Sequence, residues 1–80
     1  MARPIKEIAN EILKEWKNPS EYARMYAWPY LMAMKELNSI QDKYYLDDAD
    51  EIILRFLCNA GSFKGEAARR LKKELRDLMK

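Results

Sequence analysis

The spacing of apolar residues near the end of the chain constrains the fold more strongly than any other feature. Apolar residues recur there at intervals of four, four, four and three: Phe63, Ala67, Leu71, Leu75 and Leu78. Residues at this spacing share one face of an α-helix, while the charged residues between them cover the other faces. The segment therefore predicts an amphipathic helix that must bury one face against other elements.

The same periodicity predicts two further helices. The first begins near Pro4 and has an apolar face made of Ile5, Ile8, Ile12, Leu13 and Trp16. The second covers residues 47–60, and its broad apolar face predicts the most buried helix of the fold. Within it, Asp47 is the expected N-cap and Cys58 is expected as a small core residue. No run of the sequence alternates apolar and polar residues over the length that a strand needs.

Aromatic and methionine side chains are densest between residues 19 and 38, where Pro29 interrupts the helical pattern. Proline removes one backbone hydrogen bond and clashes with the preceding turn, so this second helix is predicted to be kinked or split at Pro29. The kink turns the faces of Trp28 and Tyr30 apart, so we expect at least one of them at the surface or in an interface. Most other large side chains of the segment are expected in the core: Tyr22, Tyr26, Leu31, Met34 and Leu37.

Three corners separate the predicted helices. Asn18 is the expected N-cap of the aromatic helix, and Ser39 is expected to open a single helical turn. In the third corner, Gly61 suits a left-handed residue after a helix, and Ser62 suits the N-cap of the last helix. Each corner is short, as in small helical bundles.

Length and composition set the class of protein. Eighty residues, 49% of them hydrophobic, make one domain with a thin core. Together with the periodicity, they predict an all-α fold: a compact bundle of four to five short helices in a single domain, residues 1–80. No segment approaches the roughly 20 apolar residues of a membrane span, and charges near the N-terminus do not fit a signal peptide. We therefore expect a cytoplasmic protein that does not contact membranes.

The sequence lacks the residues that common catalytic sites require. Without histidine, Ser–His and Cys–His nucleophile pairs cannot form, and a metal site would depend on carboxylates alone. The glycine-rich phosphate loop of nucleotide hydrolases is also missing. We therefore expect no catalytic residue, no metal and no cofactor, and a function that consists of binding.

The net charge of +2 conceals a gradient along the chain. Residues 46–58 hold one basic and four acidic side chains (−3), whereas residues 59–80 hold seven basic and three acidic ones (+4). These segments are expected to attract each other, or to pair with neighbouring copies of the chain. Because a positive helix N-terminus attracts anions, the basic segment also supplies candidate binding residues: Ser62, Lys64, Arg69, Arg70 and Arg76. An ordinary capped corner that binds only water is the alternative.

A helix-turn-helix is the second interpretation of the last two helices. Arg69, Lys73, Arg76 and Lys80 share one flank of the last helix, where they can follow the phosphates of DNA. Acidic residues interrupt this flank, however, and no Asn or Gln in the body of the helix can read bases. A small DNA-binding regulator is therefore the less favoured hypothesis.

Three stretches resemble a group of small bacteriophage proteins of unassigned function: ARPIKEIANEI, PYLMAM and FLCNAGSFKGEAARRLKKEL. The sharpest part runs from Asn59 to Arg70, where the resembling proteins often have tryptophan in place of Phe63 and arginine in place of Lys64. The resemblance covers nearly the whole chain. It implies a phage accessory protein made inside the infected cell, of a kind that often binds a host protein or sequesters a host signalling nucleotide to disable defence.

The residues and the resemblance together predict a non-enzymatic protein that acts by stoichiometric binding in host takeover or counter-defence. Its partner is expected to be a host protein or an anionic ligand of nucleotide type, captured by a homo-oligomer. Lys64 or Arg69 would hold a phosphate of such a ligand. Trp28 or Tyr30 would stack on its base.

Overall fold

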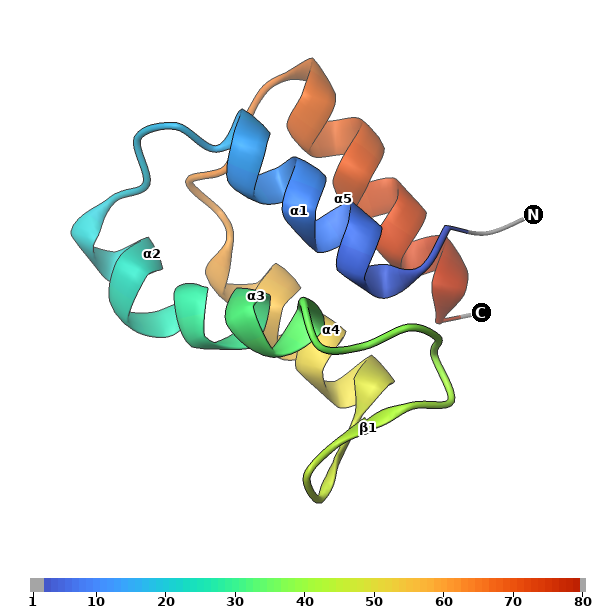
Figure 1. Cartoon of the computed structure of the whole chain (residues 1–80). Helices are drawn as coiled ribbons and strands as arrows, with labels where there is room; N and C mark the ends of the chain where they lie inside the picture. Colours follow the sequence, from blue (N-terminus) through green and yellow to red (C-terminus); the bar gives the residue numbers. More distant parts are fainter. Residues whose placement is uncertain (1–2, 80) are drawn as a thin grey trace.

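Helices dominate the computed structural model of the chain, which describes residues 3–79 (Figure 1). In chain order these residues form α1 (Ile5–Glu15), α2 (Glu21–Tyr26), α3 (Trp28–Met34), β1 (Lys43–Tyr44), β2 (Asp47–Asp48), α4 (Ala49–Asn59) and α5 (Glu66–Leu78). α1 and α5 lie side by side, and α3 packs against both α1 and α4 (Figure 1). The predicted all-α bundle of short helices is confirmed.

The aromatic segment is split next to Pro29, as predicted. α2 ends at Tyr26, Ala27 lies between the two helices, and Pro29 stands in the first turn of α3. A proline is tolerated in a first turn because the N–H groups there have no partner within the helix. The N–H of Ala27 donates to the Ala23 carbonyl at 2.9 Å, and the N–H of Leu31 donates to the Ala27 carbonyl at 3.0 Å. Backbone hydrogen bonds therefore continue on both sides of the break.

A single cluster of buried apolar side chains draws residues from every helix. α5 begins at Glu66 and buries Ala68, whereas the predicted Ala67 is only partly buried. Phe63 is buried from the segment before α5, and its ring stacks on Trp16 with centroids 4.9 Å apart. The largest fully buried side chains are Phe56, Ile5, Ile8, Ile12, Leu31, Met34, Leu37, Ile53, Leu71 and Leu75.

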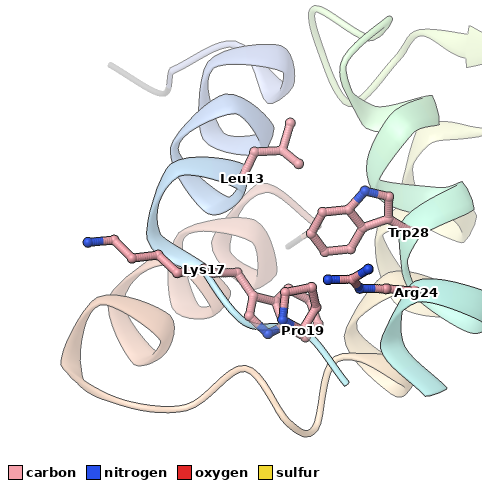
Figure 2. Close-up of a pocket in the computed structure, with 6 residues that line it drawn as sticks. Leu13, Lys17, Pro19, Arg24 and Trp28 are labelled. Atoms are coloured by element: carbon pink, nitrogen blue, oxygen red, sulfur yellow. The ribbon is translucent and has the colours of Figure 1, made fainter. Parts of the chain in front are cut away.

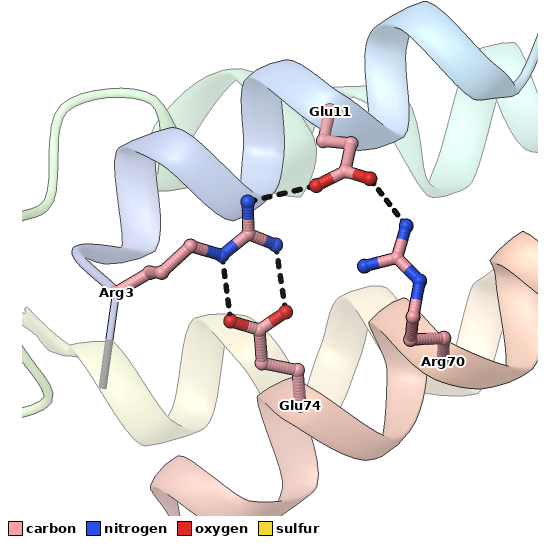
Figure 3. A network of polar contacts seen from close by, with 4 residues as sticks. All are labelled: Arg3, Glu11, Arg70 and Glu74. Atoms are coloured by element: carbon pink, nitrogen blue, oxygen red, sulfur yellow. Dashed lines mark hydrogen bonds and ion pairs between the residues drawn. The ribbon is translucent and has the colours of Figure 1, made fainter. Parts of the chain in front are cut away.

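Ion pairs join the antiparallel helices α1 and α5 (Figure 3). Arg3, just before α1, donates from Nε and Nη2 to the two carboxylate oxygens of Glu74 at 2.8 and 2.7 Å. Its Nη1 lies 2.8 Å from Oε1 of Glu11, and Arg70 pairs with the other oxygen of Glu11. The basic helix α5 thus pairs with the start of the chain, whereas the sequence suggested the acidic segment 46–58 as its partner.

A β-hairpin occupies the corner where the sequence predicted a helical turn. β1 and β2 are antiparallel, with Lys43 opposite Asp48 and Tyr44 opposite Asp47. The Asp42 carboxylate, just before the hairpin, accepts two backbone N–H groups, and these bonds hold the pKa of Asp42 below its usual value. Strands of two residues are too short to show an alternating pattern, so the sequence did not reveal them.

Two helices begin later than their predicted caps. Ser20, not Asn18, caps α2, and its hydroxyl accepts a hydrogen bond from the N–H of Ala23 at 3.1 Å. Asp48, not Asp47, precedes α4, because both aspartates belong to β2 and the helix begins only after the strand ends. Both predictions named a residue of the correct type and missed the position by one or two residues.

Three residues that were predicted in the core are exposed. Tyr22 and Tyr26 on α2 are 57% and 49% exposed, and Cys58 on α4 is exposed. α2 buries Ala23 against the core, so its larger side chains lie on the outer faces. The centroids of the two tyrosine rings lie 4.7 Å apart. The Tyr22 hydroxyl donates a hydrogen bond to Oδ1 of Asn59 at 3.0 Å. The prediction was correct for three other residues of the segment: Leu31, Met34 and Leu37.

Candidate ligand-binding site

A surface hollow of about 570 Å³ lies between the C-terminal end of α1 and the α2–α3 pair (Figure 2). Helices and the corner between them each contribute to its wall, so residues distant in the sequence meet there. Trp28 is the member of this wall that the sequence singled out as a binding residue. The hollow is lined by Leu13, Trp16, Lys17, Pro19, Arg24 and Trp28.

The aromatic part of the wall is held in place from behind. The rings of Trp16 and Trp28 meet edge-on with centroids 5.5 Å apart. Trp16 is only 5% exposed. Its ring is itself packed against those of Phe63 and Phe56, with centroids 4.9 and 6.3 Å apart. Trp28 is half-buried and packs against the core. Because the core fixes both indole rings, a ligand would meet a wall that needs little reorganisation.

Two cations complete the lining. Arg24 projects from α2 with its guanidinium beside Trp28, whereas the Lys17 side chain extends away from Trp28 (Figure 2). Within residues 3–79, neither side chain has an ion-pair partner, and the lining includes no acidic residue. The hollow is therefore a positively charged, partly aromatic site in which Arg24 is the cation best placed to meet a ligand.

This arrangement suits a flat, anionic ligand. A guanidinium offers paired N–H donors to a phosphate or a carboxylate, and such charge-assisted bonds are among the strongest in proteins. An indole ring offers a large surface for stacking on another ring. A volume of about 570 Å³ lies within the usual range of small-molecule sites.

The predicted residues other than Trp28 lie outside this lining. Tyr30 is half-buried and packs against the core. Lys64, Arg69 and Arg76 are exposed on the segment before α5 and on α5 itself. Arg70 is engaged with Glu11 of α1. The structure thus separates Trp28 from the basic residues with which the sequence grouped it, and their role in binding stays a prediction.

The predicted anion site at the start of α5 is built differently from the expectation. The N-cap is Gly65, with φ at 109°, a left-handed conformation that glycine adopts without strain. Ser62 therefore caps no helix, and its hydroxyl lies 3.4 Å from that of Ser20. Gly61 does not have the left-handed φ that the sequence predicted. The first turn of α5 carries its own carboxylate, Glu66, which already complements the positive helix end.

Lys72 holds the segment behind the aromatic wall of the hollow, a role that the sequence did not reveal. Its Nζ donates to the carbonyl oxygens of Ala60 and Phe63 at 2.8 and 2.7 Å and lies 5.8 Å from the centre of the Phe63 ring. Burial lowers the pKa of Lys72, and the charges of Arg76 and Lys64 lower it further. Lys72 thereby fixes the segment that presses Phe63 against Trp16. The spacing of residues in α5 does not distinguish Lys72 from the adjacent, exposed Lys73.

Other classes of site were sought over the same residues. Between residues 3 and 79, no group of three His, Cys, Asp or Glu side chains is arranged to hold a metal ion. In that range no helix has the length and apolar character needed to cross a membrane.

Comparisons with protein-family models, with curated proteins and with solved structures give no match.

Proposed function

We propose that this protein acts by stoichiometric binding, without catalysis, and that its hollow captures a small anionic ligand of nucleotide type. The observation that carries the proposal is the guanidinium of Arg24 beside the ring of Trp28, in a lining that includes no carboxylate. The arginine would hold a phosphate and the indole would stack on a base. This assigns the phosphate contact to Arg24, where the sequence favoured Lys64 or Arg69.

The biological setting in this proposal comes from the resemblance to small bacteriophage proteins. A phage accessory protein in the cytoplasm of an infected bacterium would lower the free concentration of a host signalling nucleotide by binding it one-to-one. Such capture requires no catalytic group, which agrees with the absence of histidine from the sequence. Capture of a host protein is the second form of the same proposal, and the exposed side chains Tyr22, Met25 and Tyr26 of α2 support it.

A DNA-binding role has weaker support. Arg69 and Arg76 are exposed on α5, as phosphate contacts would require. However, Arg70 is paired with Glu11, and Nζ of Lys73 lies 3.2 Å from Oδ2 of Asp77 on the same helix. These carboxylates reduce the positive potential that a DNA-binding helix needs. A duplex affinity that falls steeply with salt would favour this role over ligand capture.

Native mass spectrometry of protein purified from bacteria is the first experiment. A bound mass of a few hundred daltons that is released by denaturation would identify the ligand directly. In parallel, a nucleoside monophosphate, a linear dinucleotide and inorganic phosphate would be titrated while tryptophan fluorescence is recorded, because Trp28 lines the site. We expect the two nucleotides to quench the fluorescence saturably and phosphate to bind far more weakly, since it cannot stack.

Matched variants locate the site. Arg24→Ala and Trp28→Ala should each weaken nucleotide binding roughly 10- to 100-fold, the effect of losing a charged hydrogen bond or a stacked ring. Arg55→Ala removes an exposed arginine from α4, away from the hollow, and should change affinity less than about twofold. If Lys64→Glu or Arg69→Glu abolishes binding and Arg24→Ala does not, the ligand binds at α5 and the hollow is the wrong site.

A further inference from the structure

The tip of the hairpin carries the most exposed large apolar residues of the described chain. Tyr45 and Leu46 connect β1 to β2 and are 85% and 94% exposed. The hairpin projects away from the helices, so neither side chain is covered by the core (Figure 1). The rings of Tyr45 and its neighbour Tyr44 form a T-shaped pair with centroids 4.7 Å apart. Folding of a single chain gains almost nothing from these two apolar residues.

The backbone at the tip is unfavourable for the residue it holds. Tyr45 is the first residue of a two-residue hairpin loop and has φ of 58°. Glycine is the usual residue at a loop position with positive φ, because a side chain makes this conformation costly. Strained residues of this kind concentrate at functional sites, where their side chains have a role beyond the fold. An exposed tyrosine in a glycine position therefore points to a contact that the single chain does not make.

The charges next to the tip complement those of the hollow. Asp47 and Asp48 follow Leu46 directly and are exposed. Asp48 pairs with Lys43 of β1 at 3.5 Å between Oδ1 and Nζ, so Asp47 is the carboxylate that the tip offers to a partner. Asp50 and Glu51 add two negative charges in the first turn of α4. The hollow, by contrast, has aromatic and apolar walls with Arg24 and Lys17 as its charged residues (Figure 2). An apolar tip followed by carboxylates thus matches an apolar hollow with cations at its edge.

We infer that the hairpin tip of one copy docks into the hollow of a second copy of this chain. Tyr45 and Leu46 fill the space against Trp28, and Asp47 faces Arg24. The hairpin and the corner at residues 16–20 lie at separate ends of the molecule in Figure 1, so one chain cannot make this contact with itself. The contact is head-to-tail, and repeating it produces a ring or a filament. Because the tip uses the hollow proposed for the ligand, an anionic ligand and the tip compete.

A mixing experiment tests this geometry. Wild-type protein should show a mass that rises with concentration in sedimentation velocity. A tip variant, Tyr45→Ser with Leu46→Ser, and a hollow variant, Arg24→Glu, should each remain monomeric. Mixed together, they retain one intact tip and one intact hollow, so they should form a 1:1 dimer that grows no further. A wild type that stays monomeric at about 1 mM, the weak limit of specific association, overturns the inference.

Three further variants separate loss of the contact from misfolding. Tyr45→Gly relieves the positive φ, so it should leave the melting temperature unchanged or higher while it abolishes association. The charge exchange Arg24→Glu with Asp47→Arg should restore self-association that Arg24→Glu alone removes. Leu54→Ser alters another exposed apolar residue, on α4, and should leave association unchanged. If Leu54→Ser abolishes association and the tip variant does not, the contact lies elsewhere.

The tip variant also separates this inference from the proposed function. It keeps the hollow intact, so it should bind the nucleoside monophosphate at least as tightly as the wild type. Self-association lost together with unchanged nucleotide binding is the expected result. If the nucleotide binds the wild type without reducing its self-association, competition at the hollow is excluded and the docking inference fails, while the proposed function stands.

Discussion

Two parts of this small protein differ in how they place their large side chains: the helix pair α1 and α5, and α2 together with the hairpin. Along α1 and α5, most large apolar residues are buried and several charges are paired: Ile8, Ile12, Leu71 and Leu75 are fully buried, and Arg3 bridges Glu11 and Glu74. On α2 and the hairpin, large apolar residues are exposed instead, and they include Tyr22, Met25, Tyr26, Tyr45 and Leu46.

This difference separates what the fold requires from what it does not. The α1–α5 side has the arrangement expected of a surface selected for stability, with apolar residues inside and charges paired outside. α2 and the hairpin expose apolar groups that contribute little to folding, and α2 carries Arg24, which lines the hollow together with Trp28. Binding is therefore expected at α2 and the hairpin. Mutations there should change the free energy of unfolding less than mutations in α1 and α5.

The largest contrast should come from the same substitution made on each side. Leu71→Ala removes a fully buried side chain from α5 and should lower the free energy of unfolding by about 2–5 kcal/mol. Leu46→Ala at the hairpin tip should change it by less than about 0.5 kcal/mol. Urea unfolding followed by circular dichroism measures both. Equal losses would mean that the tip is part of the stable core, and the comparison would fail.

Lys72 tests how the stable side supports the hollow. Lys72→Met keeps the hydrophobic stem but removes the charged donor to the carbonyls of Ala60 and Phe63. The Ala60 carbonyl keeps its bond from the Phe63 N–H at 3.0 Å, so the main loss is at the Phe63 carbonyl and should cost about 1–3 kcal/mol. The tryptophan emission should also change, because Phe63 stacks on Trp16. The adjacent Lys73→Met, which loses only an exposed pair with Asp77, should cost less than about 0.5 kcal/mol. Identical effects of the two changes would exclude a supporting role for Lys72.

The ion-pair network should make the stable side sensitive to acid. Hydrogen bonds from Arg70 and Arg3 hold the pKa of the Glu11 carboxyl below its ordinary 4.5 in the folded protein. The folded state thus binds this proton more weakly than the unfolded state, so the network stabilises the protein above about pH 4.5. This stabilisation is lost as the pH falls through the lowered pKa of the folded state.

Glu11→Gln measures that contribution. At pH 7 the variant should be less stable by about 1 kcal/mol, a modest value because the network is partly exposed to solvent. Its melting temperature should approach that of the wild type when both are measured well below pH 4.5. Glu15→Gln, at the end of the same helix, provides the control. A Glu11→Gln deficit that persists unchanged at low pH would show that packing, not charge, is responsible.

The smallest effect is expected on the binding side. Tyr22→Phe removes the hydroxyl that bonds to Asn59, and since both groups are exposed the cost should stay below about 0.5 kcal/mol. Tyr26→Phe, in the neighbouring ring, should be neutral. Thermal unfolding in parallel would resolve the two. A loss above about 1.5 kcal/mol for Tyr22→Phe would make α2 as structural as α5 and would remove the distinction between the sides.

The sequence predicted the parts of the fold that depend on local periodicity. The spacing of Leu71 and Leu75 identified α5, and Pro29 located the break between α2 and α3. The hairpin was missed because its strands have only two residues each. Cap positions were displaced for a similar reason: several polar residues stand in each corner, and only the tertiary path of the chain selects one of them.

The hollow was only partly predictable. Trp28 was identified from its place beside Pro29, but Arg24 and Lys17 gave no signal, because they meet Trp28 only after α1 and α2 pack together. Periodicity also placed Tyr22 and Tyr26 in the core, since it cannot tell an apolar stripe that faces the core from one that faces a partner. The exposed side of this protein is therefore the part for which the structure was needed.

The bond between Arg3 and Glu74 spans 71 positions, and this has a consequence for the order in which the molecule assembles. A ribosome makes the chain from its N-terminus, so α1 is complete long before α5 exists to cover it. In the interval, the N–H groups of Ile5 and Lys6 can already bond to the carbonyls of Asn38 and Leu37 at the end of the α3 segment. α1 would then lie against α3 with one apolar face exposed, until α5, which is synthesised after the other described helices, covers that face.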